Sequence, residues 1–146
     1  MHRSGLVKLL IVEADEAFRR QLSERLKLDD CLVFEVPTES EAIKRVQSID
    51  LDVVLLGLKG SGQRGISLLN AIKNTRPLTE VILLSPLDEF SLSVSIEAMK
   101  LGAFDDLLVP FDMETLIRRV RAAYQQKKKK LEAWERESCQ EMAWQP

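Results

Sequence analysis

A run of four apolar residues, 53–56, constrains the fold of this chain more than any other feature. A strand without a water-facing side is typical of a parallel sheet that helices cover on both faces. Glycines follow at positions 57, 60, 62 and 65, and then comes an apolar repeat with helical spacing. The order strand, tight loop, helix predicts an α/β domain, in which ligands bind where the strands end. The residue at that end is Gly57, which has no side chain for chemistry.

Similar units recur along the chain and predict five strands that alternate with five helices. This alternation predicts a doubly wound parallel sheet with helices on both faces, and the flavodoxin-like strand order 2-1-3-4-5 fits it best. Thr38 and Asp112 suit helix starts, and Gly102 suits a helix end. The strands are expected at residues 6–12, 31–36, 53–56, 80–84 and 104–109.

Residues 88–101 fit two kinds of secondary structure. Positions 90–97 alternate apolar and polar side chains, which is the signature of a strand, and three serines lower the helix propensity. A strand here would break the alternation of strands and helices. We therefore predict a helix that is short, distorted or mobile.

Composition indicates one soluble domain. The chain has 146 residues and a net charge of -2, so no global field attracts nucleic acid or a membrane surface. No apolar stretch approaches the ~20 residues that span a bilayer. Cys31 and Cys139 form no metal-like cluster and, without a signal peptide, favour the cytoplasm. The single histidine, His2, argues against histidine-based catalysis and histidine-metal sites. We expect neither an enzyme nor a bound cofactor.

Three segments of the chain carry a resemblance to a known family. They read LLIVEADEAFRRQLSERL, LDVVLLGLKGSGQRGISLLNAIK and EAMKLGAFDDLLVPFDMETL. In this order they resemble the receiver domain of bacterial two-component response regulators, over about residues 6–124. The resemblance implies a CheY-like fold, a role in phosphorelay signalling and a cis bond before Pro110. We expect residues 1–124 to form the receiver-like domain and residues 125–146 a helical extension.

The resemblance also implies a phosphorylation pocket, from which this sequence departs. Family members hold Mg²⁺ with two acids after the first strand and phosphorylate an aspartate that ends the third. They add a Thr or Ser after the fourth strand, a Lys before the proline after the fifth, and an aromatic switch residue. The equivalent residues here are Glu13, Ala14, Gly57, Ser85, Val109 and, at the switch position, Asp106.

Only Ser85 and Pro110 match the family pattern. Because no acyl phosphate forms without a carboxylate at position 57, we predict a pseudo-receiver that acts through protein contacts. Mg²⁺ binding is expected to be weak or absent, with Glu13 and Asp15 as weak ligands at most. A simpler interpretation makes these two acids a helix-start pair and Ser85 a turn residue.

A glycine-rich loop offers an alternative function. Residues 60–65 read G-x-G-x-x-G between a strand and a helix, the context of a dinucleotide fingerprint. The match is weak because it lies in the third unit, and the acid expected about 20 residues later is missing. A small-molecule, nucleotide or anion-binding module that uses Gly60 to Gly65, with Arg64 nearby, stays open. An active enzyme of this fold would need a nucleophile and a base, which are lacking.

The last helix is predicted to run past the domain, because residues 125–145 contain neither Pro nor Gly. Apolar exposure at Leu131, Trp134, Met142 and Trp144 predicts a homodimer or another protein partner. A frayed polar tail is the alternative. A heptad stripe along this last helix includes Met113, Ile117, Val120, Tyr124, Lys127, Leu131, Trp134 and Ser138.

Further interface candidates lie on the surface that the family uses for signalling. They are Leu92, Ile96 and Met99.

Overall fold

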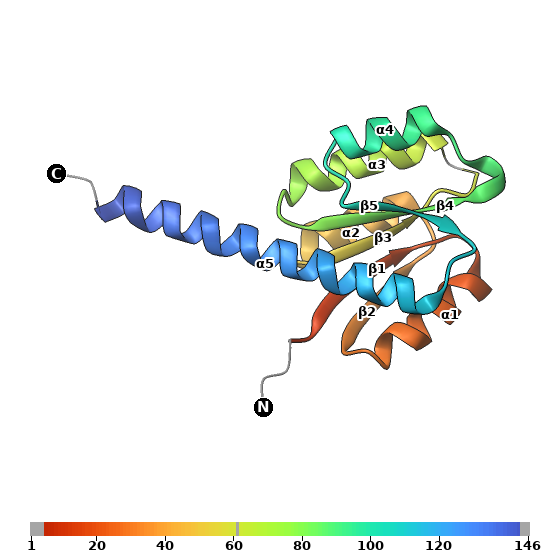
Figure 1. Cartoon of the computed structure of the whole chain (residues 1–146), viewed down its shortest axis with the longest axis horizontal. Helices are drawn as coiled ribbons and strands as arrows, with labels where there is room; N and C mark the ends of the chain where they lie inside the picture. The colour runs from red at the N-terminus through yellow and green to blue at the C-terminus, as the bar shows by residue number, and fades with distance from the viewer. Residues whose placement is uncertain (1–4, 61, 144–146) are drawn as a thin grey trace.

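A five-stranded parallel sheet with helices on both faces forms the body of the protein (Figure 1). The computed structural model describes residues 5–60 and 62–143, and the side chains of residues 140–143 are outside this description. The strand order is β2-β1-β3-β4-β5, with every neighbouring pair parallel. The predicted flavodoxin-like fold and strand order are therefore confirmed.

The elements alternate as the sequence predicts, and boundaries differ by one or two residues for most of them. The strands are β1 (Val7–Val12), β2 (Cys31–Val36), β3 (Val53–Gly57), β4 (Glu80–Pro86) and β5 (Asp105–Val109). The helices are α1 (Glu16–Lys27), α2 (Glu39–Ser48), α3 (Gly62–Thr75), α4 (Leu92–Lys100) and α5 (Met113–Ala143), with a 3₁₀ turn, η1 (Leu87–Glu89), before α4.

Alternating side chains of the central strands build two separate cores. Leu9 and Ile11 belong to the core on the side of α1 and α5. Leu10 and Val12 belong to the core on the side of α2, α3 and α4. Because successive side chains of a strand point to opposite faces, a run such as β3 must be apolar throughout. The helices on the two faces therefore hold the sheet between them and fix the position of its carboxyl edge.

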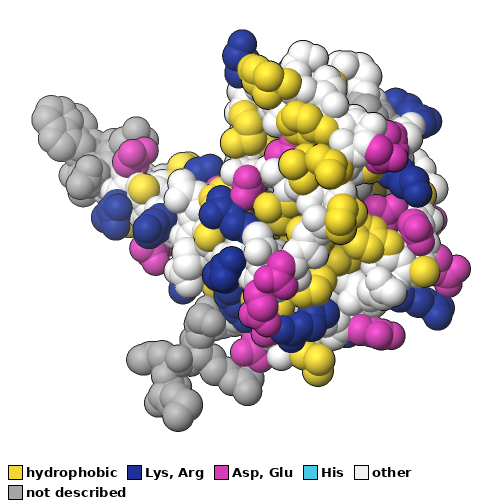
Figure 2. All heavy atoms as spheres, turned by 45° about the vertical axis from the view of Figure 1, so that its right-hand side comes forward, with side chains coloured by type: hydrophobic (Ala, Val, Ile, Leu, Met, Phe, Trp, Pro, Cys, Tyr) yellow, Lys and Arg dark blue, Asp and Glu magenta, His cyan; other side chains and the backbone are white. Residues whose placement is uncertain are grey.

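Helix α4 is short, as predicted, and spans Leu92–Lys100 within the expected range 88–101. It begins at Leu92 because the hydroxyl of Ser91 accepts a hydrogen bond from the backbone N–H of Val94. Val94 and Ala98 face the core, and the opposite stripe is exposed. Figure 2 shows hydrophobic side chains gathered on the upper part of the molecule, where α4 lies in Figure 1. The exposed large hydrophobic residues in and near α4 are Leu87, Phe90, Leu92, Ile96 and Met99.

Helix α5 continues to Ala143, well past the body of the molecule (Figure 1). The helix thus runs through most of residues 125–146, and its contact with the body ends later than predicted. Lys127 is 5% exposed and packs against the sheet, although the apolar stripe was expected to be needed only as far as Tyr124. The stripe up to Lys127 therefore serves the domain itself and is not a free coiled-coil seam. Of the four apolar residues predicted to be exposed beyond it, the side chain of Met142 and all of Trp144 lie outside the described residues.

Candidate functional site

The predicted pocket residues meet at the carboxyl edge of the sheet. Glu13 and Ala14 directly follow β1, and Gly57 is the last residue of β3. Ser85 lies near the end of β4, paired in register with Leu108 of β5, and Val109 ends β5. Because all the strands are parallel, their ends share one edge. The fold thus brings together every residue that the sequence placed at this site.

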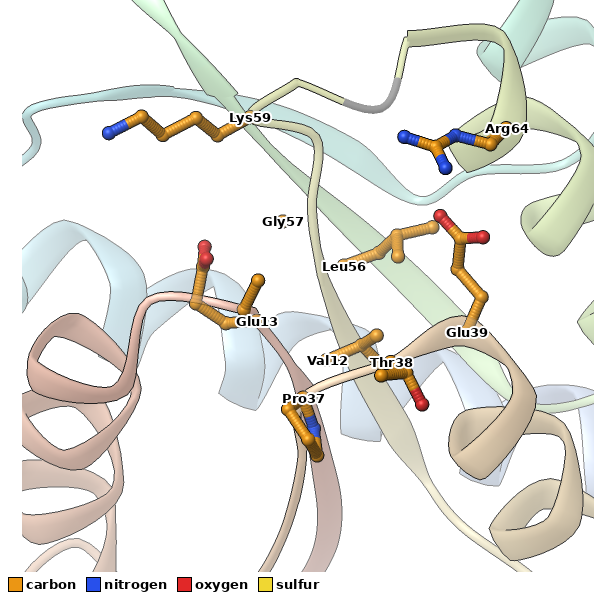
Figure 3. A pocket seen from close by; sticks show the side chains of 10 residues that line it. Val12, Glu13, Pro37, Thr38, Glu39, Leu56, Gly57, Lys59 and Arg64 are labelled. Atoms are coloured by element: carbon orange, nitrogen blue, oxygen red, sulfur yellow. The ribbon is translucent and has the colours of Figure 1, made fainter.

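Glu13 fills the space beside Gly57. A β-carbon at position 57 would lie 2.3 Å from Glu13 Oε1 and 3.0 Å from Glu13 Cδ. The Glu13 side chain points towards Gly57 (Figure 3) and the residue is 7% exposed. Its Oε2 accepts a hydrogen bond of 2.9 Å from the backbone N–H of Asp15. A carboxylate from β1 therefore occupies the volume into which a side chain at position 57 would project.

The side chains of Ser85 and Asp106 are joined by a hydrogen bond. The Ser85 hydroxyl donates to Asp106 Oδ1 over 2.5 Å, and Ser85 is 5% exposed. Asp106 occupies the position that sequence analysis assigned to the aromatic switch. The hydroxyl is thus held by a carboxylate on the neighbouring strand.

One cavity at this edge lies between the ends of β1 and β3 and the start of α2 (Figure 3). It has a volume of about 230 Å³. Lys59 and Arg64 line it together with the acids Glu13 and Glu39. In Figure 3 Lys59 extends away from Gly57, and the Arg64 and Glu39 side chains point towards each other. The mixture of charges does not favour an anion over a cation.

The glycine-rich loop is held by other contacts. The backbone N–H of Gly60 donates to Glu89 Oε1 over 3.0 Å, so this amide is not available to cradle a phosphate. Arg64 Nη2 donates to the carbonyl of Gly60 over 3.2 Å. Ser61, the second residue of the motif, is outside the described residues. These contacts weaken the dinucleotide interpretation of the motif.

A second cavity of about 340 Å³ lies on the other side of Glu13, towards β5. Its lining includes the acids Glu13, Asp15 and Asp88, the cation Lys59 and the apolar Val109. Within the described part of the chain, no three His, Cys, Asp or Glu side chains are grouped so that they could hold a metal ion. The ammonium group of Lys59 places a positive charge in the same cavity as these acids.

Sequence reasoning identified the missing side chain at position 57 but not what fills it. Glu13 and Gly57 are 44 residues apart and meet only because β1 pairs with β3. The contacts of Glu89 with Gly60 and of Ser85 with Asp106 also join separate elements of the chain, and no local pattern predicts them. The Val109–Pro110 bond is cis, which confirms the expectation from the resemblance.

One protein-family model matches most of this fold. The model of the response regulator receiver domain matches residues 9–121. The chain belongs to the response regulator receiver family. Receiver domains of this family work in two-component signalling, which is the class that the resemblance implied.

Similar curated proteins are longer than this receiver domain. "Regulatory protein AtoC" of Escherichia coli (strain K12) is 28% identical over 142 residues, which cover 97% of this chain and 30% of that protein. "Uncharacterized transcriptional regulatory protein YkoG" of Bacillus subtilis (strain 168) is 31% identical over 124 residues, covering 85% of this chain and 54% of that protein. The chain therefore spans only part of these relatives.

Solved receiver structures share the fold. The response regulator receiver domain protein (CheY-like) from Methanospirillum hungatei JF-1 superposes with a TM-score of 0.79 at 21% identity, covering 86% of this chain and 99% of that one. The response regulator receiver domain protein from Clostridium thermocellum gives 0.77 at 26% identity, with 84% and 98% coverage. Within residues 5–60 and 62–143, no helix has both the length and the apolar character needed to cross a membrane.

Proposed function

We propose that this receiver domain signals without being phosphorylated, as a pseudo-receiver that acts through contacts with other proteins. The observation that supports the proposal is the pair formed by Glu13 and Gly57. Position 57 offers no carboxylate to accept a phosphoryl group, and the Glu13 carboxylate already fills the adjacent space. A family chemistry that depends on an aspartyl nucleophile has no starting point here.

The other pocket positions support the same proposal. Ala14 supplies no second carboxylate for Mg²⁺, and Val109 supplies no ammonium group to hold a phosphoryl oxygen. The Ser85 hydroxyl is bonded to Asp106, so the two positions that would respond to phosphorylation are already joined. The domain is therefore proposed to keep one conformation of this edge and to perform no catalysis.

Two surfaces are proposed for the protein contacts. The first is the exposed stripe of α4, where Leu92 is 66% and Ile96 47% exposed. Clustered apolar exposure of this kind marks interaction sites. The second is the projecting part of α5 with Leu131 and Trp134, through which a homodimer was also predicted.

Magnesium titration tests the proposal. We expect isothermal calorimetry of the wild type to give no saturable Mg²⁺ binding below the millimolar range, because two oxygen ligands are absent. The matched control is a double variant, Ala14→Asp with Gly57→Asp, which supplies both carboxylates and is expected to bind more tightly. Submillimolar binding by the wild type would contradict the proposal.

A small-anion or nucleotide site at the cavity of Figure 3 is the second candidate, since Lys59 and Arg64 both line it. Glu13 and Glu39 in the same lining oppose an anion, so we rank it below the first proposal. A thermal-shift screen with phosphate and nucleotides decides between them. Stabilisation that disappears in an Arg64→Gln variant would favour the second candidate.

A further inference from the structure

A cluster of ion pairs fastens α5 to the amino edge of the sheet, opposite the site described above. Lys127 Nζ donates to Asp50 Oδ1 at 2.9 Å, to Asp52 Oδ1 at 3.0 Å and to the carbonyl of Leu51 at 3.1 Å. The buried ammonium group therefore has three oxygen partners from the segment that leads into β3. Such charge-assisted bonds are the stronger kind.

One turn later, a second lysine of α5 completes the cluster. Lys130 Nζ lies 3.0 Å from Glu80 Oε2, and Glu80 is 1% exposed. Lys73 Nζ lies 3.5 Å from the other oxygen of Glu80 and donates to the carbonyls of Pro77 and Thr79. Burial lowers the pKa of Lys73, and the nearby Glu80 opposes this shift. We call this cluster the basal clamp; its members are Lys127, Lys130, Lys73, Asp50, Asp52 and Glu80.

The basal clamp gives the rest of α5 a fixed direction. Figure 1 shows the second half of the helix standing clear of the sheet and of the other helices. Residues 131–143 extend for roughly 20 Å at 1.5 Å per residue. A helix of this length is marginal in water unless something supports it. The clamp supports its first turn, and a partner would support the remainder.

The clamp also changes the charge that the projecting segment presents. Lys127 and Lys130 are paired with acids of the body. Lys128, whose Nζ lies 5.6 Å from the centre of the Tyr124 ring, and Lys129 are exposed and keep their charge. Beyond them, the exposed charges are three glutamates and one arginine, around a Trp134 that is 60% exposed. The charged residues of this segment are Glu132, Glu135, Arg136 and Glu137.

We propose that residues 131–139 form a docking surface for a partner protein that presents positive charge around an apolar socket for Trp134. The inference deepens the contact-based function proposed above and identifies the chemistry of the partner. Acidic charge around an exposed aromatic group complements a basic surface. A second copy of the chain fits less well, because two acidic segments repel each other when they lie side by side.

The test uses a Trp144→Phe variant, in which Trp134 is the single tryptophan. A synthetic helical peptide of leucine and lysine is the probe, and the same peptide with glutamate for lysine is the control. We expect a saturable blue shift of Trp134 emission with the lysine peptide and none with the glutamate peptide. Replacing Glu132, Glu135 and Glu137 by Gln should weaken binding by about tenfold or more.

A clamp variant separates docking from general charge attraction. Lys127→Met with Lys130→Met makes the protein more acidic, so attraction by charge alone would strengthen binding of the lysine peptide. A surface that needs the clamp for its geometry would instead bind more weakly. Circular dichroism of the clamp variant checks that its body is folded. If that variant unfolds, the replacement of Glu132, Glu135 and Glu137 by Gln still tests the inference, because all three side chains are exposed.

Three results would overturn the inference: tighter binding by the clamp variant, equal binding of both peptides, or undiminished binding of the lysine peptide by a Trp134→Ala variant. Because Trp134→Ala removes the fluorescent group, its binding is measured by the anisotropy of a dye-labelled lysine peptide, with the protein that keeps Trp134 measured in the same way. A concentration-dependent dimer in light scattering that is lost on truncation after Lys130 would show that a second copy is the occupant. None of these results bears on Mg²⁺ binding at the opposite edge, so failure here is distinguishable from failure of the proposed function.

Discussion

Gly57 leaves the space that the Glu13 side chain occupies. The Glu13 carboxylate can lie against the end of β3 since position 57 carries no β-carbon, and the backbone N–H of Asp15 holds it there. In this arrangement the site contains one fixed carboxylate rather than a reactive one. The residue type at position 57 therefore determines both the chemistry and the packing of the edge.

Gly57→Asp is expected to lower the free energy of unfolding by about 1–2 kcal/mol. The new β-carbon displaces Glu13 from its hydrogen bond with Asp15, and the two carboxylates then repel each other. Urea unfolding measures the change. Adding Glu13→Gln removes the repulsion and should recover part of the loss. A Gly57→Asp protein as stable as the wild type would show that Glu13 does not depend on this space.

The two cysteines differ in burial, and burial makes the thiol of Cys31 harder to ionise. Burial raises the pKa of the Cys31 thiol to about 11, and Cys139 is exposed. Since the thiolate is the nucleophile, Ellman's reagent at pH 8 should modify one thiol per folded chain quickly. Cys139→Ser should abolish this fast phase. A fast thiol in the Cys139→Ser control, or two fast thiols in the wild type, would contradict the assigned burial of Cys31.

The raised pKa of Cys31 also affects stability at high pH. The thiol of the unfolded chain ionises near its ordinary value of 9.0, before the folded thiol does. The contribution of the protonated thiol is therefore complete below pH 9 and is lost as the pH rises through about 11. A Cys31→Ala variant should show a weaker decline in unfolding free energy over this range.

Among the elements, α5 differs most from what its sequence indicated. Its alternating three- and four-residue stripe resembles a coiled-coil seam, and Lys127 reads as a polar fault in that seam. In the structure this lysine is a buried packing residue whose partners, Asp50 and Asp52, come from a distant loop. The charges of one helix do not reveal whether their partners lie on the same helix or elsewhere.

Lys127→Met is expected to lower the free energy of unfolding by about 1–3 kcal/mol, because it removes a charged hydrogen-bond partner from three oxygens. Lys129→Met is the matched control, since Lys129 is exposed on the same helix turn and should change stability by less than about 0.5 kcal/mol. Chemical denaturation of both variants measures the difference. Equal effects would show that the basal clamp contributes no stability.

At the scale of the whole molecule, apolar periodicity was sufficient to predict the architecture. The apolar run in β3 and the helix end at Gly102 are local signals, and the alternation of strands and helices follows from signals of this kind. The flavodoxin-like strand order is the best fit to that alternation, and the sheet has this order. Helix α4 was harder to predict, because its alternating apolar pattern suits a strand. The helix is stabilised by the contacts of Val94 and Ala98 with the core, which the local sequence does not show. Contacts between distant strand ends, which complete the site, were outside the reach of pattern reasoning.

The central claim is that this receiver domain does not accept a phosphoryl group, and intact-mass spectrometry after incubation with acetyl phosphate and Mg²⁺ tests it directly. A receiver domain that retains the aspartate at the end of its third strand is the positive control in the same mixture. We predict that the control gains the mass of one phosphoryl group and that this chain gains none. A stoichiometric, Mg²⁺-dependent adduct on this chain that peptide mapping places at the carboxyl edge of the sheet would contradict the account.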